Sequence, residues 1–323
     1  MKAMRYRSYA FLVVFIFQSI YSSAQDSTQP VELDSVVVQA FDRGARLRDV
    51  PAAITYIGRD VLQRFGTASV VEAVNTMPGV HMEERSPGSY RFAIRGSALR
   101  SPFGVRNVKV YYNDLPLTDP SGQTYLNLLG NYDYGSVEVI KGSGSSFYGA
   151  GTGGTLLINN PGTEAPLTAE YTAGSYGLQN SYAAINLNTA TSKNRLALQH
   201  QRSNGYRVQS RLERTVLNWS GTYTINEKSI LKTTFLYSDL AYGTPGALTL
   251  AEYTANPKAA RPAAGLFPNA VDARAAIYQQ GFLAGASYTQ ALAKNFQNKT
   301  VMYGAFTRLR NPAIRNYGHN SEP

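Results

Sequence analysis

The sequence of 323 residues contains no cysteine, which excludes disulfide bonds, thiolate metal sites and a lipidated N-terminal cysteine. Beyond its N-terminus it has no run of 18 apolar residues, so any later membrane crossing must use strands instead of helices. The only three histidines, His81, His200 and His319, are widely separated and form neither a metal-binding nor a triad pattern. The sequence therefore predicts no enzyme, no metal site and no bound cofactor.

The N-terminus has the order of a secretory signal peptide. Three cations precede the apolar run at 10–17, and small residues follow it. We expect cleavage between Ala24 and Gln25, so that residues 1–24 are removed and the mature chain is exported. An uncleaved anchor is the alternative, but the apolar run is far shorter than the roughly 20 residues that cross a bilayer as a helix.

Charge is scarce, at 16% of residues, but its balance is basic, with a formal net charge of +10. Such a balance fits nucleic acid, an anionic lipid surface or an anionic ligand. Export argues against nucleic acid, which leaves a role in steering a ligand or a modest excess of cations spread over loops. The 23 tyrosines, 13 phenylalanines and 28 glycines are typical of strands that have one apolar and one polar face.

The mature chain begins with a polar, flexible segment, residues 25–49, and continues in two parts whose sequence patterns differ. The first part, residues 50–160, has the pattern of one mixed α/β domain. Helical spacing ending at Pro78-Gly79 predicts two short helices. The helices are expected at 59–65 and 69–77, and strands at 54–57, 91–95, 108–112, 136–140 and 155–158.

In residues 161–323 the apolar residues alternate with polar ones at a period of two. Leu217, Trp219 and Tyr223 share one face of a strand, whereas Asn218 and Thr222 share the other. Strands with this pattern are expected at 167–173, 181–188, 195–201, 213–225, 231–237, 278–288 and 300–308.

The connections between these strands are alternately short and long. Turns at 191–194 and 226–229 are short, whereas 202–212 and 239–276 are long, as in a transmembrane β-barrel. A soluble β-sandwich would also show period two, but it does not predict long loops at one end only. Roughly seven strands are too few to enclose a domain, for which about 22 are expected, so we expect the barrel to be incomplete in this chain.

A series of motifs in the first half resembles the plug of TonB-dependent outer-membrane receptors. In order, these are Ile94-Arg95-Gly96, Val110 to Leu117 (VYYNDLPL), Val137 to Gly142 (VEVIKG), Gly153-Gly154 and Ile158-Asn159. Ser143 departs from the pattern, because the family usually has proline after Lys-Gly. The resemblance implies an α+β plug domain followed by an antiparallel transmembrane β-barrel, here residues 161–323, in the bacterial outer membrane. A phosphate-binding loop is the alternative reading of the glycine-rich run at 142–154, but it lacks the Gly-Lys-Ser/Thr sequence before a helix.

A short strand-like segment precedes these motifs and resembles a TonB box. It consists of Asp34, Ser35, Val36, Val37, Val38, Gln39 and Ala40. The resemblance implies that it pairs with an edge strand of periplasmic TonB, which supplies energy from the inner membrane. The alternative is that the segment pairs within its own domain.

The resemblance also implies active import of a scarce ligand. Arg95 and Glu138, on separate expected strands, are expected to form a charge network where plug and barrel wall meet, with a plain structural salt bridge as the alternative for each. Ligand-binding candidates lie in expected apex loops, at 85–90, 99–106 and 119–124: Arg100, Arg106, Asp119 and Gln123, whose charges and hydrogen bonds suit a carboxylate-rich complex. The sequences of 99–106 and 253–262 are similar to those of ferric-citrate-type receptors, which implies a ferric chelate as the ligand. Cobalamin, haem or an oligosaccharide, carried in the same way, and a passive pore or adhesin remain alternatives.

Overall fold

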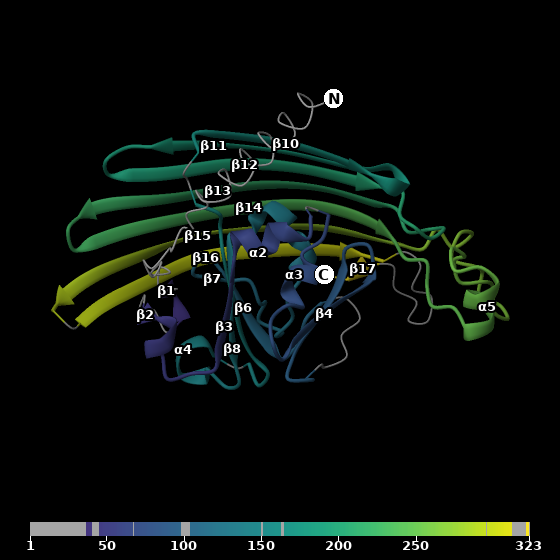
Figure 1. Ribbon diagram of the computed structural model, residues 1–323, viewed down its shortest axis with the longest axis horizontal. Coiled ribbons are helices and arrows are strands. Elements are labelled where there is room, and N and C mark those ends of the chain that lie inside the picture. The colour runs from purple at the N-terminus through teal and green to yellow at the C-terminus, as the bar shows by residue number, and fades with distance from the viewer. Residues whose placement is uncertain are drawn as a thin grey trace, which may run out of the picture. The chain divides into compact units, whose positions relative to one another are not determined.

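The computed structural model describes residues 37–40, 45–66, 68–97, 104–149, 151–162, 165–294, 296–311 and 321–322. The expected signal peptide lies outside these residues. The described residues from 45 to 162 form a mixed domain, which we call the plug, and those from 165 to 322 form a single antiparallel sheet with its connections, which we call the wall. Figure 1 shows the long strands of the wall beside the shorter elements of the plug.

The plug is built on a five-stranded sheet with the order β3-β8-β9-β6-β7. Its members are β3 (Ile54–Gly58), β6 (Val108–Tyr112), β7 (Leu115–Pro116), β8 (Ser136–Lys141) and β9 (Gly154–Asn159). All neighbours are antiparallel except β6 and β9, which are parallel. The four longer strands agree with the expected ranges to within a residue at each end, whereas β7 is too short to show an alternating pattern.

A hairpin of β4 (Val80–Ser86) and β5 (Ser89–Ile94) packs beside α2 (Arg59–Arg64) and α3 (Val71–Val74). The expected helix at 69–77 is wrong in length, because the α-helix ends at Val74. The side chain of Asn75 accepts a hydrogen bond from the main-chain nitrogen of Met82 at 2.7 Å and donates to its oxygen at 2.9 Å. These bonds tie the end of the helix to the hairpin and turn the chain into β4.

The remaining short elements of the plug connect these strands. They are η3 (Leu47–Asp49), η4 (Leu126–Leu128), η5 (Asn131–Asp133) and α4 (Ser145–Tyr148). Among the described residues, no helix has the length and apolar character needed to cross a membrane.

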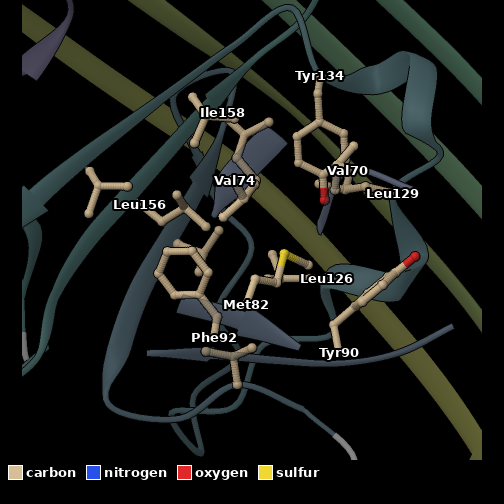
Figure 2. Packing of buried hydrophobic residues seen from close by; sticks show 14 of the residues in the cluster. Val70, Val74, Met82, Tyr90, Phe92, Leu126, Leu129, Tyr134, Leu156 and Ile158 are labelled. Carbon is tan, nitrogen blue, oxygen red and sulfur yellow. The ribbon is translucent and has the colours of Figure 1, made fainter. Parts of the chain in front are cut away.

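The main hydrophobic core joins the helices, the hairpin and the sheet of the plug. Figure 2 shows Val74 beside residues of β9, with Met82 and Phe92 of the hairpin next to them. Each such side chain, once fully buried, stabilises the fold by about 1.5–3 kcal/mol. Further members labelled in the figure are Val70, Tyr90, Leu126, Leu129, Tyr134, Leu156 and Ile158.

The wall is a meander in which each strand pairs with the next one in the sequence, always antiparallel. Its strands are β10 (Leu167–Gly174), β11 (Leu178–Asn188), β12 (Ser192–Ser203), β13 (Leu212–Asn226), β14 (Ser229–Gly243), β15 (Ala276–Ala293), β16 (Phe296–Arg310) and the two-residue β17 (Ser321–Glu322). Seven long strands are observed where seven are expected. The two outer strands, β10 and β17, do not pair with each other among the described residues, so the sheet is open.

The two faces of the wall differ in the way that the alternation predicts. Asn218 of β13 and Gln279 of β15 are buried against the plug, and each hydrogen-bonds to a plug side chain. Apolar residues on the opposite face remain exposed, among them Leu198, Phe282 and Phe306. A β-strand places successive side chains on opposite faces, and an apolar outer face is what lipid requires.

The connections of the wall are all short at one end, whereas at the other end those between β12 and β13 and between β14 and β15 are longer. Short turns join β11 to β12, β13 to β14 and β15 to β16, and we call this the short-turn end. At the other end, residues 244–275 form the longest connection and contain α5 (Leu250–Ala255), while η6 (Ser175–Gly177) joins β10 to β11. Thr249 caps α5 through its side chain, together with Glu252.

The tip of the β4–β5 hairpin lies at the long-connection end of the wall. Gly88 has a φ of 79°, and a Cβ atom there would lie 3.1 Å from Cδ1 of Leu212 and 3.4 Å from Cδ1 of Tyr242. Glycine is needed both for the left-handed conformation and for the close approach. One of the expected apex loops, 85–90, is therefore at this end.

Candidate functional site

The main chain at the end of β1 (Val37–Val38) is bound by a buried carboxylate of the plug. Glu138 accepts hydrogen bonds from the main-chain nitrogen of Gln39 with both carboxylate oxygens, each at 2.9 Å, and from that of Ala40 at 3.0 Å. Glu138 is 1% exposed. Burial raises the pKa of its carboxyl, an effect that the two main-chain donors oppose.

Glu138 is positioned by the central sheet of the plug. It lies on β8, between Tyr56 of β3 and Leu157 of β9. The same region buries Val38 and Ala40 in a small apolar cluster with Ile140, Tyr148 and Leu157. Charge-assisted hydrogen bonds and apolar contacts thus fix the end of the segment together.

The segment also pairs within its own domain, through β2 (Ala45–Arg46). This is the alternative that the sequence left open, and the structure shows it for Val37 and Val38. Of the residues expected to form a TonB box, Asp34, Ser35 and Val36 lie outside the described residues. Val37 is 50% exposed, so one face of β1 is accessible.

The structure does not bring Arg95 and Glu138 together. Arg95 is exposed, has a φ of 52° and follows β5, where its main-chain nitrogen donates to the oxygen of Gly79 at 2.8 Å. No hydrogen bond or ion pair joins it to Glu138 in the described part of the chain. Glu138 instead accepts from the main chain of Gln39 and Ala40, so the described contacts do not join the two residues, and a role of either in coupling plug and barrel stays a prediction.

Three of the four expected ligand-binding residues do lie together. The exposed Arg106 donates to Oε1 of Gln123 from Nε at 3.3 Å and from Nη2 at 3.2 Å. The main-chain nitrogen of Gln123 donates to Oδ1 of Asp119 at 2.9 Å. A guanidinium fixed in this way suits an anionic ligand. The fourth residue, Arg100, lies outside the described residues.

A cavity of about 480 Å³ adjoins this cluster. It is bordered by Asp119 and Tyr125 of the plug and by Gly281 and Tyr303 of the wall. Among the described residues, no group of three or more His, Asp or Glu side chains is arranged to hold a metal ion.

The sequence did not reveal a buried polar network between plug and wall. Asp133 accepts a hydrogen bond from the main-chain nitrogen of Gly130 at 2.7 Å and one from Nδ2 of Asn218 at 2.9 Å. Asn218 also donates to the hydroxyl of Tyr112, which donates to Oδ1 of Asn160. Burial raises the pKa of Asp133 to about 6. The polar alternation of β13 was the available signal, but it did not identify these partners.

A second missed residue is Arg214 of the wall, which is 1% exposed. Its guanidinium donates to the main-chain oxygens of Asn127 at 3.3 Å and Leu129 at 2.8 Å, and to Oε1 of Gln201 at 2.6 Å. A third is Asp114 at the β6–β7 turn, which forms ion pairs with Lys232 and Lys299. These contacts attach the plug to the wall at several places along β13 to β16.

Comparison with known proteins agrees with this architecture. Residues 46–155 match the family described as the TonB-dependent Receptor Plug Domain. The ferric citrate transporter FecA in its unliganded form is 19% identical, with a TM-score of 0.63 over 80% of this chain and 40% of that one. The ferric yersiniabactin uptake receptor FyuA from Yersinia pestis is 12% identical, with a TM-score of 0.64 over 80% of this chain and 41% of that one.

A further match is the ferripyoverdine receptor of the outer membrane of Pseudomonas aeruginosa, which is 17% identical, with a TM-score of 0.59 over 82% of this chain and 35% of that one. The chain thus spans well under half the length of these receptors. Residues 46–155 are accordingly a plug domain of the TonB-dependent receptors, and the strands that follow have the fold of the barrel wall in these receptors of the bacterial outer membrane.

Proposed function

We propose that this protein takes part in the active import of a ferric chelate across the bacterial outer membrane, driven by TonB. A barrel wide enough for a chelate would leak unless a plug filled it, and the outer membrane has no energy source of its own. The plug must therefore be moved by work delivered from the periplasmic side, and the segment ending at Gln39 and Ala40 is where we place that contact.

The observation that carries the proposal is the contact of Glu138 with the main chain of Gln39 and Ala40. A strand added to a partner's sheet offers its main-chain N–H and C=O groups to that partner. The N–H group of Gln39 is occupied by Glu138, so full pairing with TonB requires this bond to break. Glu138 thereby acts as a clasp that keeps the segment on the plug until a partner competes for it.

There is space for such a partner beside the clasp. A polar cavity of about 710 Å³ is bordered by Val37, Gln39 and Glu138, and by Lys193 and Lys232 of the wall. Among the described residues β1 pairs with no strand other than β2, which leaves its second edge for a partner strand.

The cluster of Arg106, Asp119 and Gln123 supports an anionic ligand. Its exposed guanidinium is oriented by Gln123, and a fixed planar donor recognises carboxylates well. The solved receptors of this fold named above handle ferric citrate, ferric yersiniabactin and ferripyoverdine. Together these features favour a ferric chelate rich in carboxylates.

The test uses the receptor expressed from its complete gene, with and without residues 34–40. Binding of ferric citrate, other ferric chelates, haem and cobalamin is measured on the purified protein, and uptake is measured in iron-limited and cobalamin-limited cells. We expect a ferric chelate to bind both forms, and uptake to require the segment and TonB. Unchanged uptake without the segment would show that passage is passive. Selective binding of cobalamin or haem would show that this compound, and not a ferric chelate, is the substrate.

A further inference from the structure

A carboxylate of the plug lies between two lysines near the short-turn end of the wall. Nζ of Lys299 is 2.7 Å from Oδ1 of Asp114, and Nζ of Lys232 is 3.2 Å from Oδ2. The hydroxyl of Ser287 donates to the same Oδ2 at 3.2 Å. Three neighbouring strands, β14, β15 and β16, therefore contact this one side chain.

The turn between β6 and β7 presents Asp114 to the wall. Asn113 and Asp114 have φ angles of 47° and 76°, a left-handed conformation that Asn and Asp tolerate better than most residues. Oδ1 of Asn113 accepts a hydrogen bond from the main-chain nitrogen of Asn160 at 2.8 Å. Because this bond fixes the turn on the plug, any movement of the turn carries the sheet with it.

The pair of Asp114 and Lys299 differs from the other ion pairs of the described chain in its burial. The side chain of Asp114 is 15% exposed and that of Lys299 19%, whereas Lys232 is 44% exposed and both members of the Arg91–Glu83 pair are more than a third exposed. Burial alone would raise the pKa of Asp114, but the charges and hydrogen bonds of the two lysines outweigh it and keep that pKa below its usual value. Exposed pairs contribute little, whereas removing one partner of a buried pair leaves an uncompensated charge.

A continuous hydrogen-bonded path connects Asp114 to the clasp. Glu138 lies on β8, and β8 pairs with β9. β9 in turn pairs with β6, whose last residue, Tyr112, directly precedes the turn that carries Asp114. Gln39 also borders a cavity of about 200 Å³ that Asp114 and Lys299 line. A pull on β1 that reaches the sheet through Glu138 therefore acts on the contact between Asp114 and the wall.

We propose that Asp114, between Lys232 and Lys299, is a latch that fastens the pulled sheet of the plug to strands β14–β16, and that this part of the plug leaves the wall only when the latch opens. The role in import rests on the proposed function. The latch itself is a property of the plug–wall contact and can be measured without TonB.

Thr234 provides a reporter for opening of the latch. It is 4% exposed, and its hydroxyl lies 3.4 Å from Nδ2 of Asn113, directly beneath the turn. Residues 1–323 contain no cysteine, so Thr234→Cys introduces the only thiol of this part of the receptor, and any cysteine in the rest of the complete receptor is replaced by serine. The rate at which a polar maleimide labels this thiol is measured in the complete receptor purified in detergent.

We expect Asp114→Asn to raise the labelling rate about tenfold or more, which corresponds to about 1.4 kcal/mol of opening free energy. Lys232→Gln combined with Lys299→Gln should have a similar effect, and adding Asp114→Asn to this pair should add little. Lys228→Gln, at an exposed lysine in the turn between β13 and β14, should leave the rate unchanged. Unheated gel migration of each variant confirms that the barrel is folded.

An unchanged labelling rate in Asp114→Asn would overturn the latch. So would a combined variant whose rate increase equals the product of the increases in Asp114→Asn and in the lysine pair, because the two changes would then act independently. Either result leaves the proposed import intact, because uptake is tested separately by deletion of residues 34–40. Conversely, uptake that survives this deletion removes the import proposal but does not alter the labelling rates.

Discussion

Arg214 of the wall donates a hydrogen bond at 2.8 Å to the main-chain oxygen of Leu129 in the plug. The same guanidinium binds the oxygen of Asn127, which lies within η4, while Leu129 directly follows this short helix. Carbonyl groups at the end of a helix lack N–H donors from a further turn, and Arg214 supplies the hydrogen bonds instead. Arg214 makes no ion pair in the described part of the chain. A buried cation is thus bound by neutral oxygens of a domain more than eighty residues away in the sequence.

Replacement of Arg214 should loosen the plug. Arg214→Met is expected to destabilise the complete receptor by roughly 3 kcal/mol, because it removes charged hydrogen bonds and leaves buried carbonyl oxygens unpaired. Arg214→Lys should recover only part of the loss, since lysine lacks the planar fork. The midpoint of urea unfolding in detergent measures both. Arg211→Lys, at an exposed arginine just before β13, is the matched control. If Arg214→Met unfolded at the same urea concentration as the unmodified receptor, the prediction would be contradicted.

Replacement of Glu138 should release the end of β1. In Glu138→Gln one carboxylate oxygen becomes an NH₂ group, which cannot accept a hydrogen bond from Gln39 or Ala40. We expect the ratio of bound to released segment to fall about tenfold or more, because charged hydrogen bonds are lost. A spin label on Val37→Cys, in a receptor from which any other cysteine has been removed, measures the mobile fraction by electron paramagnetic resonance. Glu83→Gln, at an exposed carboxylate paired with Arg91, should leave the spectrum unchanged.

The features that follow from local alternation were predictable from the sequence. Leu217, Trp219 and Tyr223 revealed the outer face of β13 because side-chain direction in a strand depends only on parity. The partners of buried polar groups were not predictable in this way. Lys232 and Asp114 are 118 residues apart, and Gln39 and Glu138 are 99 apart. Nothing local distinguishes these residues from solvated ones, so the clasp and the latch require the tertiary structure.

Asp133 should make the stability of the plug depend on pH. Its pKa is about 6 in the folded protein, against about 3.9 for an unperturbed aspartate. Between these values the folded state binds a proton that the unfolded state does not, so stability decreases as pH rises from about 4 to 6. The contribution is roughly 2–3 kcal/mol, present below the lower value and lost above the upper one.

The check is urea unfolding of the complete receptor at several pH values between 4 and 7. Asp133→Asn should remove this part of the pH dependence, whereas Asp60→Asn, at an exposed position in the first turn of α2, should retain it. An identical pH profile for Asp133→Asn and the unmodified receptor would show that the pKa of Asp133 does not differ between the folded and unfolded states.

Arg106 should set the preference for anionic ligands. Arg106→Gln removes the charge next to Gln123 and is expected to weaken binding of ferric citrate about tenfold, within the range for one charge-assisted contact. Arg106→Lys keeps the charge but not the two hydrogen bonds to Gln123, so it should recover the effect only partly. Titration of the complete receptor measures the affinities, and Arg91→Gln, at an arginine that pairs with Glu83 on the hairpin, serves as the control. Equal loss of affinity for a neutral ligand would mean that Arg106 only maintains the shape of the 119–124 loop.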